Sequence, residues 1–156
     1  MKYKIELVSN DADFYTIALS EILPGHAPFK NMNSLMRQIS PDTPKVTTAT
    51  INAFFKAGGI MAVATTRGQL VVGIAHLIFT VKSNATTGRI EHVGVSAKHR
   101  KRGLAREMTR LLIGKARERD VRYLDLTTGI DNAPARKLYE SLGFVERESV
   151  PYRLTF

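Results

Sequence analysis

The chain has 156 residues and no cysteine. The length suits one domain, since single domains commonly run about 100 to 150 residues, and the lack of cysteine excludes disulfides, thiolate metal sites and a cysteine nucleophile. The 23 Lys and Arg residues against 14 Asp and Glu residues give a net charge of +9, which favours anionic partners such as nucleotides, nucleic acid or acidic substrates. The longest apolar stretch, Leu70 to Phe79, is too short to cross a bilayer and the N-terminus lacks the apolar core of a secretory signal, so we expect a cytoplasmic protein without membrane contact.

The first half of the chain alternates predicted strands and helices joined by short turns. The predicted elements are a strand at 4–8, helices at 11–22, around 34–39 and at 47–56, and strands at 60–65 and 70–81. The first helix is predicted from the helical spacing of Phe14, Ile17 and Ala18 after a run of capping residues. The last two strands are predicted to form a hairpin, because Gly68 in the turn between them can adopt a positive φ.

The second half changes from strand to helix periodicity. The predicted elements are strands at 89–95 and 121–127, helices at about 103–119 and from Asn132 to Gly143, and two final strands at 144–148 and 151–156. Leu104, Met108, Leu111 and Leu112 form one apolar stripe of the longer helix, with charges on its opposite face. A series of strands followed by strand–helix–strand units indicates an α+β or mixed sheet.

The most informative segment is a strand that leads through a basic turn into a helix. Glu91 to Val95 form the strand, and the turn carries Arg100, Lys101 and Arg102 before Gly103. Free backbone N–H groups at a helix start attract anions, and a glycine there lets the backbone approach a phosphate. The alternative is an ordinary solvated start of a charged helix. Neither GxGxxG nor GxxxxGK[ST] occurs, so a dinucleotide-binding Rossmann turn and a P-loop are not supported.

These residues resemble the GCN5-related N-acetyltransferase (GNAT) family. The family's acetyl-CoA motif, Arg/Gln-x-x-Gly-x-Gly/Ala, is matched by Arg100, Gly103 and Ala105. A second family signature, Asn-x-x-Ala-x-x-Leu-Tyr-x-x-x-Gly-Phe, is matched from Asn132 to Phe144. The resemblance is specific over residues 89–145 and only topological before them.

The resemblance implies one GNAT domain over residues 1–156, with a substrate-side half at about 1–88 and an acetyl-CoA-binding half at about 89–145. It implies an α+β fold with a central splayed, mostly antiparallel sheet of about six to seven strands and about four helices. Acetyl-CoA would enter the gap of this sheet and pair its pantetheine with one strand. The cofactor-binding residues that the resemblance implies are Val93, Gly94, Val95, Arg100, Lys101, Arg102, Gly103, Leu104, Ala105, Arg106 and Asn132.

The resemblance also implies that Tyr139 acts as the general acid near the thioester sulfur. Tyr139 follows Asn132 by about two helical turns, so both side chains can reach one extended cofactor. A phenol with a pKa near 10 is protonated at neutral pH and can donate to a departing thiolate. Without the flanking signature, Tyr139 would be taken as an ordinary half-buried helix aromatic.

Glu91 is the candidate general base, because an alkyl ammonium must lose a proton before its nitrogen can attack. An ion pair with one of the many basic residues is an equally good interpretation of Glu91. In a regular strand Glu91 shares a face with Val93, and His92 points the other way. His26 and His76 fall in or opposite the expected acceptor region, but a lone histidine is more often a surface or core residue. No spacing of histidines and carboxylates indicates a metal, so direct transfer is expected.

Two other functions compete with N-acetylation of a primary amine on a small molecule or protein. The first is a nucleic-acid-binding module that uses residues 98–106, although this would leave the signature at 132–144 unexplained. The second is a protein of the same fold that binds acyl-CoA without turnover. The sequence leaves open the acceptor, the acyl chain length and whether the protein forms a homodimer.

Overall fold

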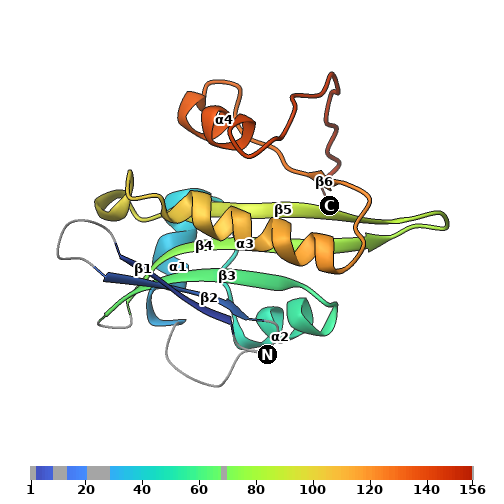
Figure 1. The fold of residues 1–156 in the computed structure, drawn as a ribbon. Coiled ribbons are helices and arrows are strands. Elements are labelled where there is room, and N and C mark those ends of the chain that lie inside the picture. Colours follow the sequence, from blue (N-terminus) through green and yellow to red (C-terminus); the bar gives the residue numbers. More distant parts are fainter. Residues whose placement is uncertain (1–2, 9–13, 21–28, 68–69, 156) are drawn as a thin grey trace.

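The computed structural model describes residues 3–8, 14–20, 29–67 and 70–155. Among these residues, six strands form one sheet in chain order, from β1 to β6. The elements are β1 (Tyr3–Val8), β2 (Phe14–Ser20), α1 (Phe29–Ile39), α2 (Thr48–Lys56), β3 (Ile60–Thr66), β4 (Val71–Val81), β5 (Thr86–Val95), a short 3-10 helix (Ala97–His99), α3 (Leu104–Glu118), β6 (Leu124–Asp125) and α4 (Ala133–Glu140). All neighbouring strands are antiparallel except β5 and β6. The expected mixed fold with a mostly antiparallel sheet is confirmed (Figure 1).

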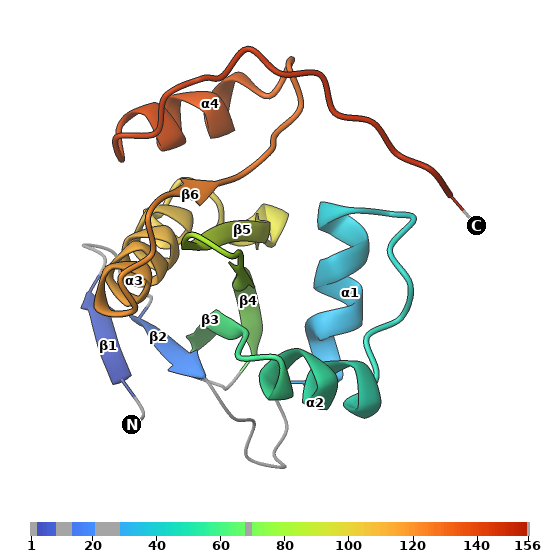
Figure 2. The same ribbon diagram turned by 90° about the vertical axis from the view of Figure 1, so that its right-hand side faces the viewer.

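Helices cover both faces of the sheet (Figure 2). The apolar stripe of α3 packs on one face, where Leu104, Met108 and Leu112 are buried against Leu77 and Ile90. On the other face, residues of α1 and α2 form a second core with β3 and β4, which contains Met32, Leu35, Met36, Ile51, Met61, Val63, Val71 and Ile74. The methionine-rich face of α1 is therefore core. No helix in the described ranges is long and apolar enough to cross a bilayer.

The N-terminal helix predicted at 11–22 is wrong for the residues that the structure describes. Residues Phe14–Ser20 form the strand β2, which pairs Ile17 with Ile5 of β1 and with Ala64 of β3. The segment FYTIALS fits either period, because Tyr15, Ile17 and Leu19 also alternate, and pairing on both sides favours the strand. The predicted cap residues before Phe14 and the glycine of the 67–69 turn lie outside the described residues.

The two C-terminal strands predicted at 144–148 and 151–156 are also wrong over the described part of the segment. Residues 144–155 form no strand. Ion pairs attach this segment to its neighbours instead: Arg136 binds Glu146 at 2.7 Å, and Arg147 binds Asp125 at 2.9 Å. Pro151 also lacks the N–H that a strand ladder uses.

Candidate functional site

Strands β5 and β6 separate shortly after they meet. Their parallel pairing is confined to Gly88 with Leu124 and Arg89 with Asp125. On its other side β5 pairs with β4, but its register shifts: Ile74 faces Gly94, whereas His76 faces Glu91. One extra residue therefore lies in β5, a β-bulge, and His92 at this point has a φ of 53°. On the side away from β4, the last residues of β5 have no strand partner among the described residues and form an open edge.

The backbone N–H and C=O groups of Val95 point outward at this open edge. The N–H of Ser96 donates to the carbonyl of Val72 on β4 at 2.8 Å. Because antiparallel strands alternate, the N–H and C=O of Val95 must face away from β4. The guanidinium Nε of Arg100 occupies that side and donates to the Val95 carbonyl at 3.1 Å. An extended ligand could therefore add to this edge as a strand does.

Gly94 has a packing role in the structure. A Cβ at Gly94 would overlap the side chain of Ile39, the last residue of α1. The absence of a side chain therefore allows the end of α1 to lie directly against β5. The C-terminal end of α1 therefore covers β5 at Gly94, next to the open edge.

The basic turn has the backbone geometry of an anion site. Lys101 and Gly103 both adopt positive φ, at 62° and 78°, directly before α3. Gly103 is the N-cap residue of α3, and no side chain among the described residues caps this terminus. The first N–H groups of α3 are therefore left for another acceptor, and alternating backbone conformations of this kind form anion-binding concavities. A Cβ at Gly103 meets no described atom within 4 Å, so conformation rather than crowding favours glycine there.

The arginines around this turn are held by contacts within the chain. Arg106 Nη2 donates to Ser141 Oγ at 2.9 Å, which joins the start of α3 to the end of α4. This contact brings the basic turn close to the helix that carries Tyr139. Lys101 is exposed, and its ammonium is available to an anion above the turn.

Asn132 and Tyr139 occupy different environments on α4. Asn132 caps the helix, and its Oδ1 accepts the N–H of Ala135 at 3.3 Å. Tyr139 is 9% exposed and packs edge to face on Phe144 at 5.9 Å between ring centroids. Burial raises the pKa of Tyr139 above its ordinary value of 10.0, so the phenol stays protonated at neutral pH.

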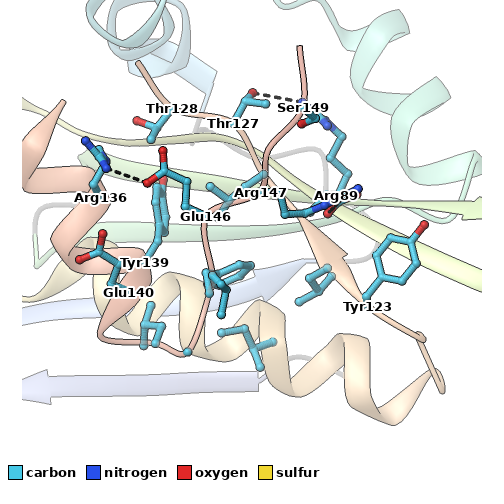
Figure 3. Close-up of a pocket in the computed structure, with 18 of the residues that line it drawn as sticks. Arg89, Tyr123, Thr127, Thr128, Arg136, Tyr139, Glu140, Glu146, Arg147 and Ser149 are labelled. Carbon is cyan, nitrogen blue, oxygen red and sulfur yellow. Dashed lines mark hydrogen bonds and ion pairs between the residues drawn. The ribbon is translucent and has the colours of Figure 1, made fainter. Parts of the chain in front are cut away.

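Tyr139 lines a pocket of about 760 Å³ between α3, β6, α4 and the C-terminal segment. Thr128, Arg136 and Glu146 surround it, and the ion pair between Arg136 and Glu146 lies beside the phenol (Figure 3). Asn132 and the basic turn are not among the residues that line this pocket. A hydrogen bond between Ser141 and Arg106 connects the end of α4, which carries Tyr139, to the start of α3 beside the turn.

Glu91 is held by Arg89, two residues earlier on β5. The Nε of Arg89 contacts Glu91 Oε1, and its Nη2 donates to Thr127 Oγ1 at 3.1 Å, just beyond β6. Arg89 thus bridges the two strands where they separate. The side chain of Glu91 is 33% exposed, so it is paired with a basic residue and still reachable by solvent.

The bulge changes which side chains share a face. Val93 packs against the core beneath α3, whereas the rings of His92 and His76 lie 5.2 Å apart and His76 contacts Phe54 of α2. His92 therefore points to the α1 and α2 side together with Glu91, and Val93 points the opposite way. The faces predicted from regular alternation are wrong because the extra residue shifts the pattern by one. Sequence reasoning missed His92, since the bulge depends on the register with β4.

No group of three or more His, Asp or Glu side chains within the described ranges could hold a metal ion. The candidate site has four parts. They are the open edge of β5, the basic start of α3, the buried phenol of Tyr139, and Glu91 with the imidazoles of His76 and His92 on the side of the sheet where α1 and α2 lie.

We compared the sequence and the fold with those of known proteins. Residues 30–144 match the acetyltransferase (GNAT) family. An uncharacterized N-acetyltransferase, YsnE, from Bacillus subtilis (strain 168) is 41% identical over 59 residues, which span 36% of this chain and 39% of that protein.

Among solved structures, a protein from Agrobacterium tumefaciens str. C58 assigned as an acetyltransferase is 26% identical, with a TM-score of 0.72 over 88% of this chain and 99% of that one. The aminoglycoside N-acetyltransferase AAC(6')-Iy, solved in complex with CoA, shares the fold at 18% identity, with a TM-score of 0.75 over 95% of this chain and 99% of that one. The family match covers most of the chain, including the open edge, the basic turn and α4, and the protein therefore belongs to the GNAT family of acetyltransferases.

Proposed function

We propose that this protein transfers an acetyl group from acetyl-CoA to a primary amine of a small molecule or protein, by direct attack in a ternary complex. The observation that carries the proposal is the open edge at the end of β5, which is followed by a short 3-10 helix, the basic turn and the uncapped start of α3. An extended pantetheine suits the edge, and a pyrophosphate suits the free N–H groups of the helix start with Lys101 nearby. The CoA complex of AAC(6')-Iy, which has the same fold, supports this choice of ligand.

The residues fit the two proton transfers that the reaction needs. The amine nitrogen forms a bond to the thioester carbonyl carbon, and the carbon–sulfur bond breaks as the thiolate leaves. Tyr139, kept protonated by burial, can donate its proton to that thiolate. Glu91, directly or through water, is the first candidate for taking the proton that the amine loses. Its contact with Arg89 holds the carboxylate close to the point where β5 and β6 separate, which supports this choice.

The test is acetyl transfer by the purified protein to a panel of primary amines, followed by thiol release and by mass spectrometry of the N-acetyl product. We expect CoA release that depends on the amine, with one acetyl group added. Binding of acetyl-CoA without transfer to any amine, peptide or protein would instead support a protein of this fold without turnover. A short DNA duplex that binds and competes with CoA for the basic turn would favour the nucleic-acid alternative.

A further inference from the structure

The bulge in β5 brings the imidazole of His92 next to that of His76, on the side of the sheet where α1 and α2 lie. His92 is the residue with a positive φ, 53°, which non-glycine residues rarely adopt. Its ring meets that of His76 edge to face at 5.2 Å, and His76 in turn meets Phe54 at 5.2 Å. Strained residues of this kind gather at functional sites, which makes the pair a candidate for chemistry.

Each ring has a buried nitrogen without a hydrogen-bond partner among the described residues. The two atoms are His76 Nε2 and His92 Nδ1. The structure has no hydrogen bond between these two atoms. Because buried polar atoms are nearly always paired, a small rotation of either ring that joins them would satisfy both. If His92 Nδ1–H donates to His76 Nε2, the lone pair of His92 lies on Nε2, where it can accept a proton.

The surroundings of the pair suit this arrangement. His76 is 8% exposed, and burial, with a smaller effect of His92, lowers its pKa from 6.5 to about 3. His76 is therefore neutral at physiological pH and can accept the hydrogen bond. Phe54 of α2 contacts His76, Glu91 lies opposite His76 in the β4–β5 ladder and pairs with Arg89, and the uncharged Ile39 of α1 lies beside Gly94.

The pair lies beside the open edge on which the proposed acetyl-CoA would lie. Glu91 faces His76 across the β4–β5 ladder, and the open edge begins just after His92. Tyr139 approaches from the opposite side of the sheet, since its neighbour Phe144 packs against the core beneath α3. An acid for the leaving thiolate and an acceptor for the amine proton therefore lie on opposite sides of the edge. Glu91 Oε1 is already engaged by Arg89.

We propose that His92, in place of Glu91, accepts the proton of the ammonium substrate and that His76 is a positioning residue, which orients the His92 ring through a hydrogen bond. The inference rests on the proposed acetyl transfer. The N–H bond of the ammonium ion breaks first, and its proton moves to His92 Nε2, which later releases it to solvent. The neutral nitrogen then forms the C–N bond, and as the C–S bond breaks the thiolate takes the proton of Tyr139. The second proton that the nitrogen loses returns to Tyr139 through water.

The test uses two amines of similar shape and different basicity. Benzylamine is an ammonium ion at neutral pH, whereas the nitrogen of O-benzylhydroxylamine is largely unprotonated there, and the aromatic ring of both suits the apolar side near Phe54. His92→Asn removes the base while keeping a residue that tolerates positive φ. We expect kcat/KM for benzylamine to fall about 100-fold and that for O-benzylhydroxylamine to change less than about fivefold.

His76→Phe keeps a ring against Phe54 but removes both nitrogens. We expect a loss of about tenfold with benzylamine and a displaced pH profile of kcat/KM, since His92 keeps its ring but loses its orientation. A structural role alone would lower the rates with both amines equally. Circular dichroism and thermal unfolding of each variant verify that the fold is kept.

Calorimetry with acetyl-CoA separates failure of this inference from failure of the proposed function. If the wild-type protein and His92→Asn bind acetyl-CoA equally and the amine-dependent difference is found, the inference stands. Equal rate losses with both amines, or unchanged rates, overturn the role of His92 while leaving acetyl transfer intact. Wild-type protein that binds acetyl-CoA but acetylates neither amine overturns the assignment of an amine site beside His92. If the wild-type protein does not bind acetyl-CoA, the proposed function itself is overturned.

Discussion

Replacing His76 by Phe should make the stability of the protein less sensitive to acid. The pKa of His76 is lowered from 6.5 to about 3 in the folded protein, because burial penalises the charged ring. Below pH 6.5 the unfolded chain binds a proton that the folded protein does not, so stability is complete above pH 6.5 and falls progressively down to about pH 3. Between pH 7 and pH 4.5 this single group should lower the free energy of unfolding by about 2.5 kcal/mol.

The measurement is urea unfolding of the wild type and of His76→Phe at pH 7 and pH 4.5, with the midpoint and slope fitted at each pH. The phenyl ring cannot take up the proton and should still pack on Phe54. We expect the wild type to lose about 2.5 kcal/mol more than the variant over this interval, since the other titrating groups are common to both. An equal loss in the two proteins would refute the reasoning, because His76 would then be protonated in the folded state without penalty.

Three other changes test separate parts of the account. Tyr139→Phe should lower kcat about 100-fold with little change in acetyl-CoA affinity, and an unchanged rate and pH profile would remove the phenol from the mechanism. Gly94→Ala should destabilise the protein by about 1–3 kcal/mol through overlap with Ile39, and Ile39→Ala should restore part of that loss; thermal unfolding without such coupling would contradict the contact. A double-mutant cycle on Arg136 and Glu146 should give a coupling of only about 0.2–1 kcal/mol, because both side chains are partly exposed; a much larger value would mean that the pair is desolvated.

Local signals in the sequence were sufficient for the elements that carry the family motifs. The stripe of Leu104, Met108 and Leu112 predicted α3, and the buried faces agree. Asn132 as a cap and Gly143 as a stop predicted α4, and the structure shows Asn132 capping the helix and Gly143 at a φ of 89°. Caps and stops act within a few residues, so one sequence contains all the information they need.

The elements that failed depend on distant partners. FYTIALS at 14–20 suits a helix or a strand, and only the edges of β1 and β3 decide between them. The C-terminal segment alternates as a strand should, yet ion pairs to Asp125 and Arg136 attach it elsewhere.

Within the candidate site, too, the features that depend on distant residues could not be predicted from the sequence. The open edge, the basic turn and Tyr139 follow from motifs, but the bulge at His92 is a mismatch between two strands. Regular alternation therefore placed His92 on the wrong face and left it out of the site. The packing of Ile39 on Gly94 was equally beyond sequence reasoning, because it joins α1 to β5 across the fold.

The central claim is that the open edge and the basic turn bind acetyl-CoA, and isothermal titration of acetyl-CoA into three proteins tests it most directly. The proteins are the wild type, Lys101→Glu at the turn, and Lys56→Glu, which makes the same charge change at an exposed position on α2. We expect micromolar binding to the wild type, at least about tenfold weaker binding to Lys101→Glu, and no change for Lys56→Glu. No binding to the wild type, or equal weakening by both substitutions, would contradict the account.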